Sequence, residues 1–307
     1  FYSVPWLIQW EYGVFNCSDN LNITEEETIK FQKVIERLLR ENDGYCSQDL
    51  LYKNISQELP GIYAKNDIKS SQNIFYIAAY LFSESFLFSR PHIALKDRFT
   101  SLDSKTIALE LMGCLNMMNA DEFFALARKF QWSDITAGLV FSNIEHEYVR
   151  LDKNTYQATD SFELNDQDRK YVSDLLLSSA ADEWYLPLQR FADSEDFTPG
   201  GLHINEFLID SIVSKYGLDW HIVNPQVKDR RYAKGILVKN TQNITAYDQL
   251  IAKILSDAGF QTLSPGQLLS FLQIHQLAFK IIPKELEVSK YFEVSEEQFT
   301  LIQAQEG

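Results

Sequence analysis

Cysteine is scarce in this sequence, and its three cysteines stand far apart, at Cys17, Cys46 and Cys114. An odd number of scattered cysteines without CxxC spacing excludes a disulfide framework and the usual zinc-binding patterns. Reduced, free thiols are typical of proteins inside the cell. We therefore expect an intracellular protein, either cytoplasmic or associated with the nucleus or nucleoid.

Long apolar runs are also missing, because no stretch approaches the ~18 residues that a membrane span needs. The chain begins at Phe1 with an aromatic segment that has neither the basic start nor the small-residue cleavage site of a signal peptide. We expect no membrane contact. Residues 1–23 are expected to form an ordered aromatic arm that packs on the rest of the chain. The alternative is that this arm marks an interface with another protein.

Basic residues are outnumbered, since 28 Lys and Arg stand against 43 Asp and Glu, for a net charge of −15. Every section of the chain is acidic when it is counted separately. Proteins that bind DNA use clustered Lys and Arg to neutralise phosphates. The deficit argues against DNA binding by most of this chain.

Catalytic patterns are absent as well. The sequence has no Ser, Cys or Lys nucleophile motif and no Gly-rich phosphate loop. The acidic run at 193–197 lacks the Gly and the final Glu of a calcium loop, so we expect a solvated loop. No pair of histidines has the i, i+4 spacing of metal ligands on a helix; the five are His92, His146, His203, His221 and His275. The sequence predicts a non-enzymatic protein without metal, cofactor or small-molecule substrate.

Helical periodicity dominates what is present. Thr24 followed three residues later by Glu27 predicts a capped helix start, and apolar residues recur at helical spacing from Phe31 to Leu39. The segment 47–63 predicts a second helix that stops at Pro60 and Gly61, and 70–85 predicts a third. The segment 86–97 has strand character, which Pro91 confines to an edge or a bend.

A shorter unit follows. It contains predicted helices at 101–115, 119–130 and 133–144, with Asn119 and Ser133 as N-caps. Two β segments, 148–151 and 155–157, then flank a polar turn at 152–154. We expect Val149 and Leu151, two positions apart on one strand face, to close the open side of the three helices.

The short unit is repeated. A shift of 144 positions places Ile107 on Ile251 and Leu111 on Leu255, so we expect both leucines to be buried. The preceding longer unit has a counterpart at a shift of 132, which places Phe75 on Phe207. The expected fold is α+β, mainly α with small β wings, as a duplicated long–short pair. The expected boundaries are an arm at 1–23 and modules at 24–99, 100–160, 161–243 and 244–307.

These units resemble the winged helix-turn-helix modules of transcription and chromosome proteins. The resemblance rests on an apolar helix, a small-residue turn, a second helix at "LSPGQL" and a terminal wing strand. It covers most of residues 24–303 and implies binding of nucleic acid or of protein. In such modules the third helix enters the major groove of DNA. The candidate third helix at 133–144 contains no Lys or Arg.

One segment is an exception to the acidic pattern. A predicted wing carries a basic cluster that could contact a phosphate backbone, made of Lys228, Arg230, Arg231, Lys234 and Lys239. The other interpretation is a solvated hairpin whose charges pair with neighbours such as Asp229.

The sequence thus predicts a non-catalytic protein of tandem winged helices with a protein partner, in a transcription, replication or chromosome assembly. The alternative is direct DNA binding through the basic cluster. An enzyme with a site assembled between modules has no residue in its favour.

Overall fold

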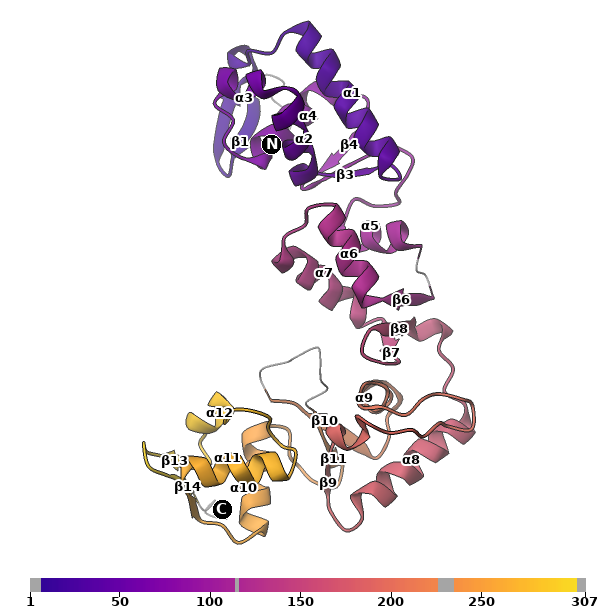
Figure 1. Ribbon diagram of the computed structural model, residues 1–307, viewed down its shortest axis with the longest axis vertical. Helices are drawn as coiled ribbons and strands as arrows, with labels where there is room; N and C mark the ends of the chain where they lie inside the picture. Colours follow the sequence, from indigo (N-terminus) through magenta and orange to yellow (C-terminus); the bar gives the residue numbers. More distant parts are fainter. Residues whose placement is uncertain (1–6, 114–115, 226–234, 303–307) are drawn as a thin grey trace. The chain divides into compact units, whose positions relative to one another are not determined.

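The chain divides into two units in the computed structural model, Phe1–Glu147 and Tyr148–Gly307 (Figure 1). The structure describes residues 7–113, 116–225 and 235–302. Its helices alternate with small three-stranded antiparallel sheets, which confirms the predicted α+β class. The two units do not separate the four predicted modules, whose boundaries stay a prediction.

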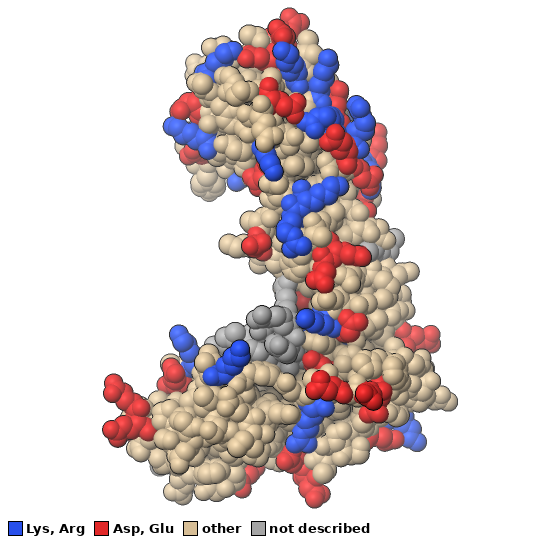
Figure 2. All heavy atoms as spheres, viewed as in Figure 1, with Lys and Arg blue, Asp and Glu red and all other residues tan. Residues whose placement is uncertain are grey.

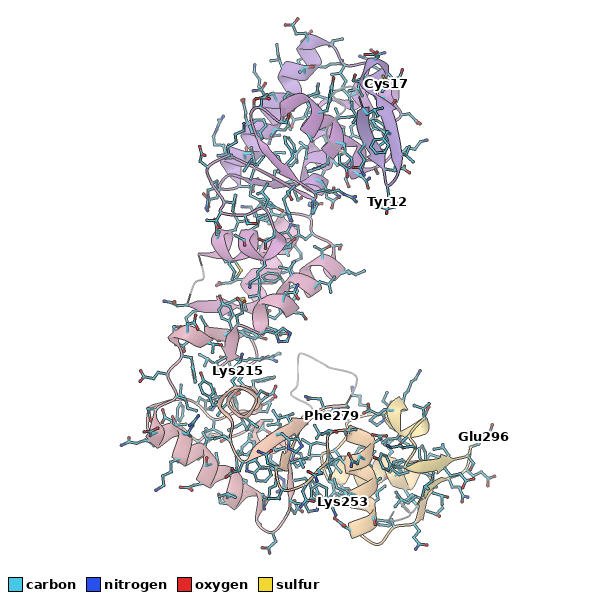
Figure 3. All side chains as sticks on the ribbon, turned by 180° about the vertical axis from the view of Figure 1, so that it is seen from behind. Tyr12, Cys17, Lys215, Lys253, Phe279 and Glu296 are labelled. Atoms are coloured by element: carbon cyan, nitrogen blue, oxygen red, sulfur yellow. The ribbon has the colours of Figure 1, made fainter. Side chains whose placement is uncertain are left out.

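The N-terminal arm is a β-hairpin. Strand β1 (Leu7–Glu11) pairs with β2 (Val14–Cys17). Ile8 is buried in the core of the first unit, and the Trp10 carbonyl accepts a hydrogen bond of 2.8 Å from the Asn73 side chain. The predicted packing of the arm is therefore confirmed for these strands. Tyr12, at the turn, is 97% exposed (Figure 3).

The first long segment has the predicted helices and one more. They are α1 (Glu25–Glu41), α2 (Gln48–Glu58), α3 (Pro60–Asn66) and α4 (Ser71–Phe82). Thr24 and Glu27 form the predicted capping box. Pro60 does follow the end of α2, but it also begins α3, because a proline is favourable in the first turn of a helix. The sequence prediction missed that second role.

A small sheet completes this segment. It contains β3 (Tyr45–Ser47), β4 (Leu87–Ser89) and β5 (His92–Ala94), with β5 in the middle. Pro91 lies in the turn between β4 and β5, which confirms the predicted bend.

The second and third helices of the next segment begin at the predicted N-caps Asn119 and Ser133, whereas the first begins at Ser104, later than predicted. The elements of this segment are, in order, α5 (Ser104–Met112), β6 (Met117–Asn119), α6 (Ala120–Lys129) and α7 (Asp134–Glu145). Ile107 and Ala108 are fully buried in α5, whereas Leu111 is only partly buried. The prediction of a buried Leu111 is wrong, because this side chain shares the face of Ile107 but lies in the last turn of α5, where it is covered only in part.

The predicted hairpin opens the second unit, as β7 (Tyr148–Arg150) and β8 (Thr155–Ala158). Asp152 holds its turn by accepting from the backbone N–H groups of Asn154 and Thr155, at 2.8 and 2.9 Å. Val149, however, joins a core made by the helices that follow, and Leu151 packs against that same core. The expectation that they close the preceding three helices is wrong.

Two helices and a sheet follow in the second unit. They are α8 (Asp166–Ala180), β9 (Tyr185–Pro187), a 3-10 turn at Leu188–Phe191, α9 (Glu206–Tyr216), β10 (Trp220–Val223) and β11 (Ile236–Lys239). Phe207 on α9 is buried as Phe75 is on α4, in agreement with the predicted correspondence.

The last segment repeats the order of the short unit. It contains α10 (Tyr247–Asp257), β12 (Thr262–Leu263), α11 (Pro265–Ile274), α12 (Lys284–Glu287), β13 (Phe292–Val294) and β14 (Phe299–Leu301). Leu255 is 1% exposed, as predicted. Its third helix, α12, is only four residues long.

Among the described residues, the three-stranded sheets that lie wholly inside one unit share one strand order. In each, the strand that comes last in the sequence lies in the middle, as in β3-β5-β4, β10-β11-β9 and β12-β14-β13. Repetition is therefore visible in the strand pairing and not only in the sequence.

The sheet of β9, β10 and β11 packs on both faces. Leu186 and Leu237 belong to the core of α8 and α9, while Tyr185 and Val238 belong to the core of α10. Alternate residues of a strand point to opposite faces, so one short sheet joins two sets of helices. This explains why residues 161–302 do not separate into two units.

Candidate functional site

Helix α7 is well defined by local signals. The Ser133 hydroxyl accepts from the Thr136 backbone N–H at 3.1 Å, which caps the first turn. Its inward face is formed by Ala137, Val140, Phe141 and Ile144, all buried. The helix is therefore fixed on its inner side, and its outer face is held rigidly towards solvent.

The outer face of α7 is apolar at its centre. Ile135 and Leu139, one turn apart, are 77% and 63% exposed. Gly138 lies beside them, and a Cβ built there would meet no atom within 4 Å. Ile135 and Leu139 are thus adjacent exposed aliphatic side chains on a well-packed helix, which makes this face a candidate interaction surface.

The charges of α7 are all negative. Its residues include Asp134 and Glu145 but no Lys or Arg. On the face of the molecule drawn in Figure 2, Lys and Arg of the described residues lie beside Asp and Glu, and no continuous basic stripe is visible. Because α7 carries no Lys or Arg, it has no side chain that could neutralise a phosphate.

The predicted basic wing lies mostly outside the described residues. This applies to four of its five cations, namely Lys228, Arg230, Arg231 and Lys234. Lys239, the last residue of β11, is described: its ammonium lies 5.5 Å from the centre of the Trp220 ring. The structure therefore does not test the cluster as a whole.

His92 is not the isolated residue that its sequence suggested. It is 2% exposed, and its Nδ1 and Nε2 lie 2.9 Å from the Tyr45 hydroxyl and 2.9 Å from the Ser104 hydroxyl. The Trp132 indole N–H donates to the same Tyr45 oxygen at 3.0 Å. Burial lowers the pKa of His92 to about 4, although the nearby Asp103 carboxylate opposes that shift. We call the buried residues Tyr45, His92 and Trp132, together with the half-buried Ser104, the buried tetrad.

The buried tetrad joins separate parts of the first unit. Tyr45 and His92 come from the β3-β5-β4 sheet, Ser104 begins α5, and Trp132 lies in the turn before α7. Ser47 adds a hydrogen bond to the Phe130 carbonyl. The sheet and the α5–α7 helices are thus fastened to each other through satisfied buried polar groups, which rigidifies the support of α7.

The other sequence candidates show structural roles. His203 lies within 2.9 Å of the Ser194 carbonyl, and an isolated bridge between Phe197 and His203 closes the acidic loop. Among the described residues, no three His, Cys, Asp or Glu side chains form a group suited to a metal. Cys17 and Cys46 are free thiols, and burial raises the pKa of Cys46.

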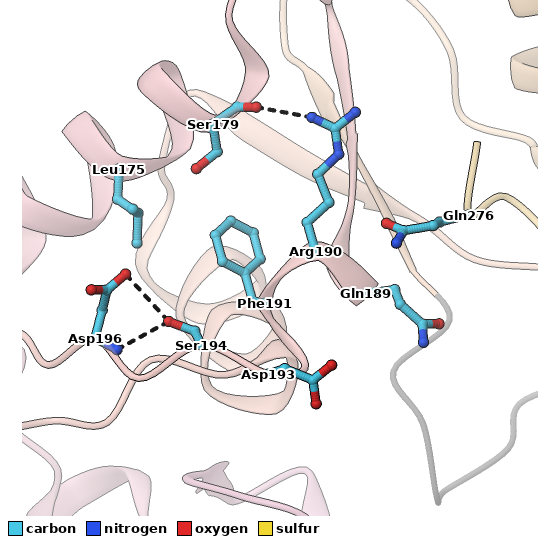
Figure 4. Close-up of a pocket in the computed structure, with 9 residues that line it drawn as sticks. All are labelled: Leu175, Ser179, Gln189, Arg190, Phe191, Asp193, Ser194, Asp196 and Gln276. Atoms are coloured by element: carbon cyan, nitrogen blue, oxygen red, sulfur yellow. Dashed lines mark hydrogen bonds between the residues drawn. The ribbon is translucent and has the colours of Figure 1, made fainter. Parts of the chain in front are cut away.

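A pocket of about 480 Å³ lies in the second unit between the end of α8, the 3-10 turn and Gln276 (Figure 4). Arg190, on its wall, already donates to the Ser179 carbonyl and the Glu183 carboxylate. Ser194 donates to Asp196. Arg190 and Ser194 thus hold the loop, whereas the side-chain oxygen of Gln189, also on this wall, is buried without a hydrogen-bond partner in the described structure.

No helix in the described part of the chain is both long and apolar enough to span a bilayer. No protein-family model matches the chain, and no curated protein matches it.

Proposed function

We propose that this chain is a non-catalytic interaction protein of tandem winged helices, and that the outer face of α7 binds a partner protein. The element order of helix, strand, two helices and two strands supports the winged-helix assignment, as does the central position of the last strand. The resemblance to transcription and chromosome proteins supports a place in a nucleic-acid-associated assembly inside the cell.

The observation that carries the proposal is the chemistry of α7. It is a third helix, the element that reads DNA in DNA-binding winged helices. Here it offers Ile135 and Leu139 with no cation. Burying such aliphatic side chains contributes about 1.5–3 kcal/mol each. Contact with phosphates would leave these side chains exposed to water and would bring the carboxylates of α7 close to anions, which repel them. A protein surface is the better match.

Selection of peptides from a displayed random library on the immobilised chain tests this. We expect selected peptides that bind the wild type and lose about tenfold or more in affinity on I135D/L139D, since Asp cannot be buried there without cost. The matched control is I274D/I281D, because Ile274 and Ile281 are 78% and 71% exposed in the second unit. Circular dichroism checks that both variants fold. Peptides that bind the α7 variant as well as the wild type would contradict the proposal.

A further inference from the structure

We infer that the partner of α7 is an amphipathic helix with Lys or Arg along one edge of its apolar face. This inference rests on the proposed function and adds the chemistry of the partner. It is carried by the arrangement of apolar and charged residues around α7.

The two carboxylates of α7 lie on one edge of its apolar strip. At 3.6 residues per turn, Asp134 and Glu145 are separated by about 20° around the axis and by about 16 Å along it. Ile135 and Leu139 project about 100° and 140° further around the helix from Asp134. The buried residues Ala137, Val140, Phe141 and Ile144 occupy the opposite side. The outer face is thus an apolar strip with an acidic border.

The acidic border has no cation of its own helix to neutralise it. The nearest preceding cations are Arg128 and Lys129 in the last turn of α6, and the Lys129 ammonium lies 5.3 Å from the centre of the Phe130 ring. After α7, Glu147 is paired with Lys105. A partner with basic residues along the matching edge is attracted, and an acidic partner is repelled.

Gly138 favours a helical partner on the outer face of α7. It lies between the acidic border and Leu139, and no atom occupies the space where its Cβ would be. A missing side chain at this point lets a helix axis approach closely, and apolar side chains spaced i and i+4 can interdigitate with Ile135 and Leu139. Because α7 offers no strand edge, an extended peptide would gain no backbone pairing here.

Three synthetic peptides of about 18 residues test the inference. They share a helical scaffold: one has a leucine face bordered by lysine, the second has glutamate in place of lysine, and the third has glutamine in place of leucine. Fluorescence anisotropy of the labelled peptides is measured with the intact chain at about 50 and 300 mM salt. We expect the lysine peptide to bind about tenfold or more tightly than either other peptide, and to weaken with salt.

Charge reversal on the protein locates the effect. D134K/E145K is expected to invert the preference between the lysine and glutamate peptides, while E296K/E297K, at exposed positions of the second unit, leaves it unchanged. An equal effect of both variants would mean a response to net charge alone and would overturn the inference. So would equal binding of the lysine and glutamate peptides, or no binding of either.

The failure of this inference is distinguishable from that of the proposed function. If library peptides depend on Ile135 and Leu139 but are not basic, α7 remains a binding surface and only the partner chemistry is wrong. If no selected peptide depends on these residues, both proposals fail.

Discussion

The Trp132 indole N–H donates to the Tyr45 hydroxyl oxygen at 3.0 Å, and this bond determines the protonation of His92. An indole nitrogen can only donate, so the Tyr45 oxygen accepts from it and is left with its own hydrogen to donate. That hydrogen points to Nδ1 of His92, 2.9 Å away. Neutral His92 then carries its proton on Nε2 and donates to Ser104.

Nitrogen-15 NMR tests this assignment. At pH 7 we expect His92 to be neutral, with Nε2 protonated and Nδ1 unprotonated, because only this tautomer satisfies all four residues of the buried tetrad. The His92→Gln variant identifies the signal. A spectrum in which Nδ1 carries the proton would contradict the direction of the hydrogen bonds from Trp132 through Tyr45 to His92.

The stability of the first unit is expected to fall in mild acid. The unfolded imidazole has a pKa near 6.5, and burial lowers the pKa of His92 to about 4, so between these values the unfolded state binds more protons. The contribution of neutral His92 to the free energy of unfolding, about 3 kcal/mol, is fully present above about pH 6.5. It is lost as the pH falls to about 4. Urea unfolding at several pH values measures it. The His92→Gln variant should show a smaller slope in this window, and an unchanged slope would argue against a buried neutral His92.

Truncation of Leu255 and of Leu111 is expected to have different costs. Leu255→Ala removes a fully buried side chain and should lower the free energy of unfolding by about 2–5 kcal/mol. Leu111→Ala should cost about 1 kcal/mol, since that side chain is only partly buried. Denaturant unfolding measures both. Equal losses would contradict the partial burial of Leu111.

Gly200 and Gly138 should respond in opposite ways to alanine. A Cβ at Gly200 would lie 2.2 Å from a carboxylate oxygen of Asp168, which is 1% exposed and accepts from the Gly200 N–H at 2.7 Å. Gly200→Ala should therefore destabilise by about 1–3 kcal/mol. Gly138→Ala meets open space in a helix and should stabilise by up to ~1 kcal/mol. Thermal unfolding of the two variants gives the sign of each change.

Binding of duplex DNA is expected to be weak at physiological salt. The net charge of −15 repels a polyanion, and only the cluster that includes Arg230 and Arg231 could oppose this locally. Any affinity should fall steeply with salt, since each phosphate contact releases counterions, and should vanish in R230E/R231E. Anisotropy of a labelled duplex measures it. Tight binding in high salt would favour the alternative of a DNA-binding protein.

Features set by neighbouring residues were predictable from the sequence. Thr24 with Glu27, Ser133, and the turn at Asp152 were all identified, because their bonds join residues within three positions of each other. The internal repeat was predictable because buried positions such as Phe75 and Phe207 constrain residue type.

Features set by distant contacts were not predictable. The environment of His92 could not be predicted, because its partners Tyr45 and Ser104 lie 47 and 12 positions away, on other elements. The core that Val149 joins could not be predicted, because the alternation of a strand shows which residues share a face but not which helices pack against that face. The turn at Gly13, with φ of 75°, was a local signal for the β1–β2 hairpin that the sequence prediction overlooked.

The exposed face of α7 was predictable only in part. The lack of Lys and Arg in this segment was visible in the sequence, but which side of the helix is buried depends on its packing against α5 and α6. A periodic helix with apolar residues on several sides does not reveal which of them remain exposed. Ile135 and Leu139 therefore emerge as candidates from the structure alone.

Hydrogen–deuterium exchange of the intact chain, alone, with a selected peptide and with duplex DNA, tests the central claim most directly. With peptide, we expect slower amide exchange at 134–145 and no change there in I135D/L139D. With duplex at physiological salt, we expect no change in α7. Unchanged exchange in α7 with peptide, or protection of α7 by duplex, would contradict a protein-binding role for this helix.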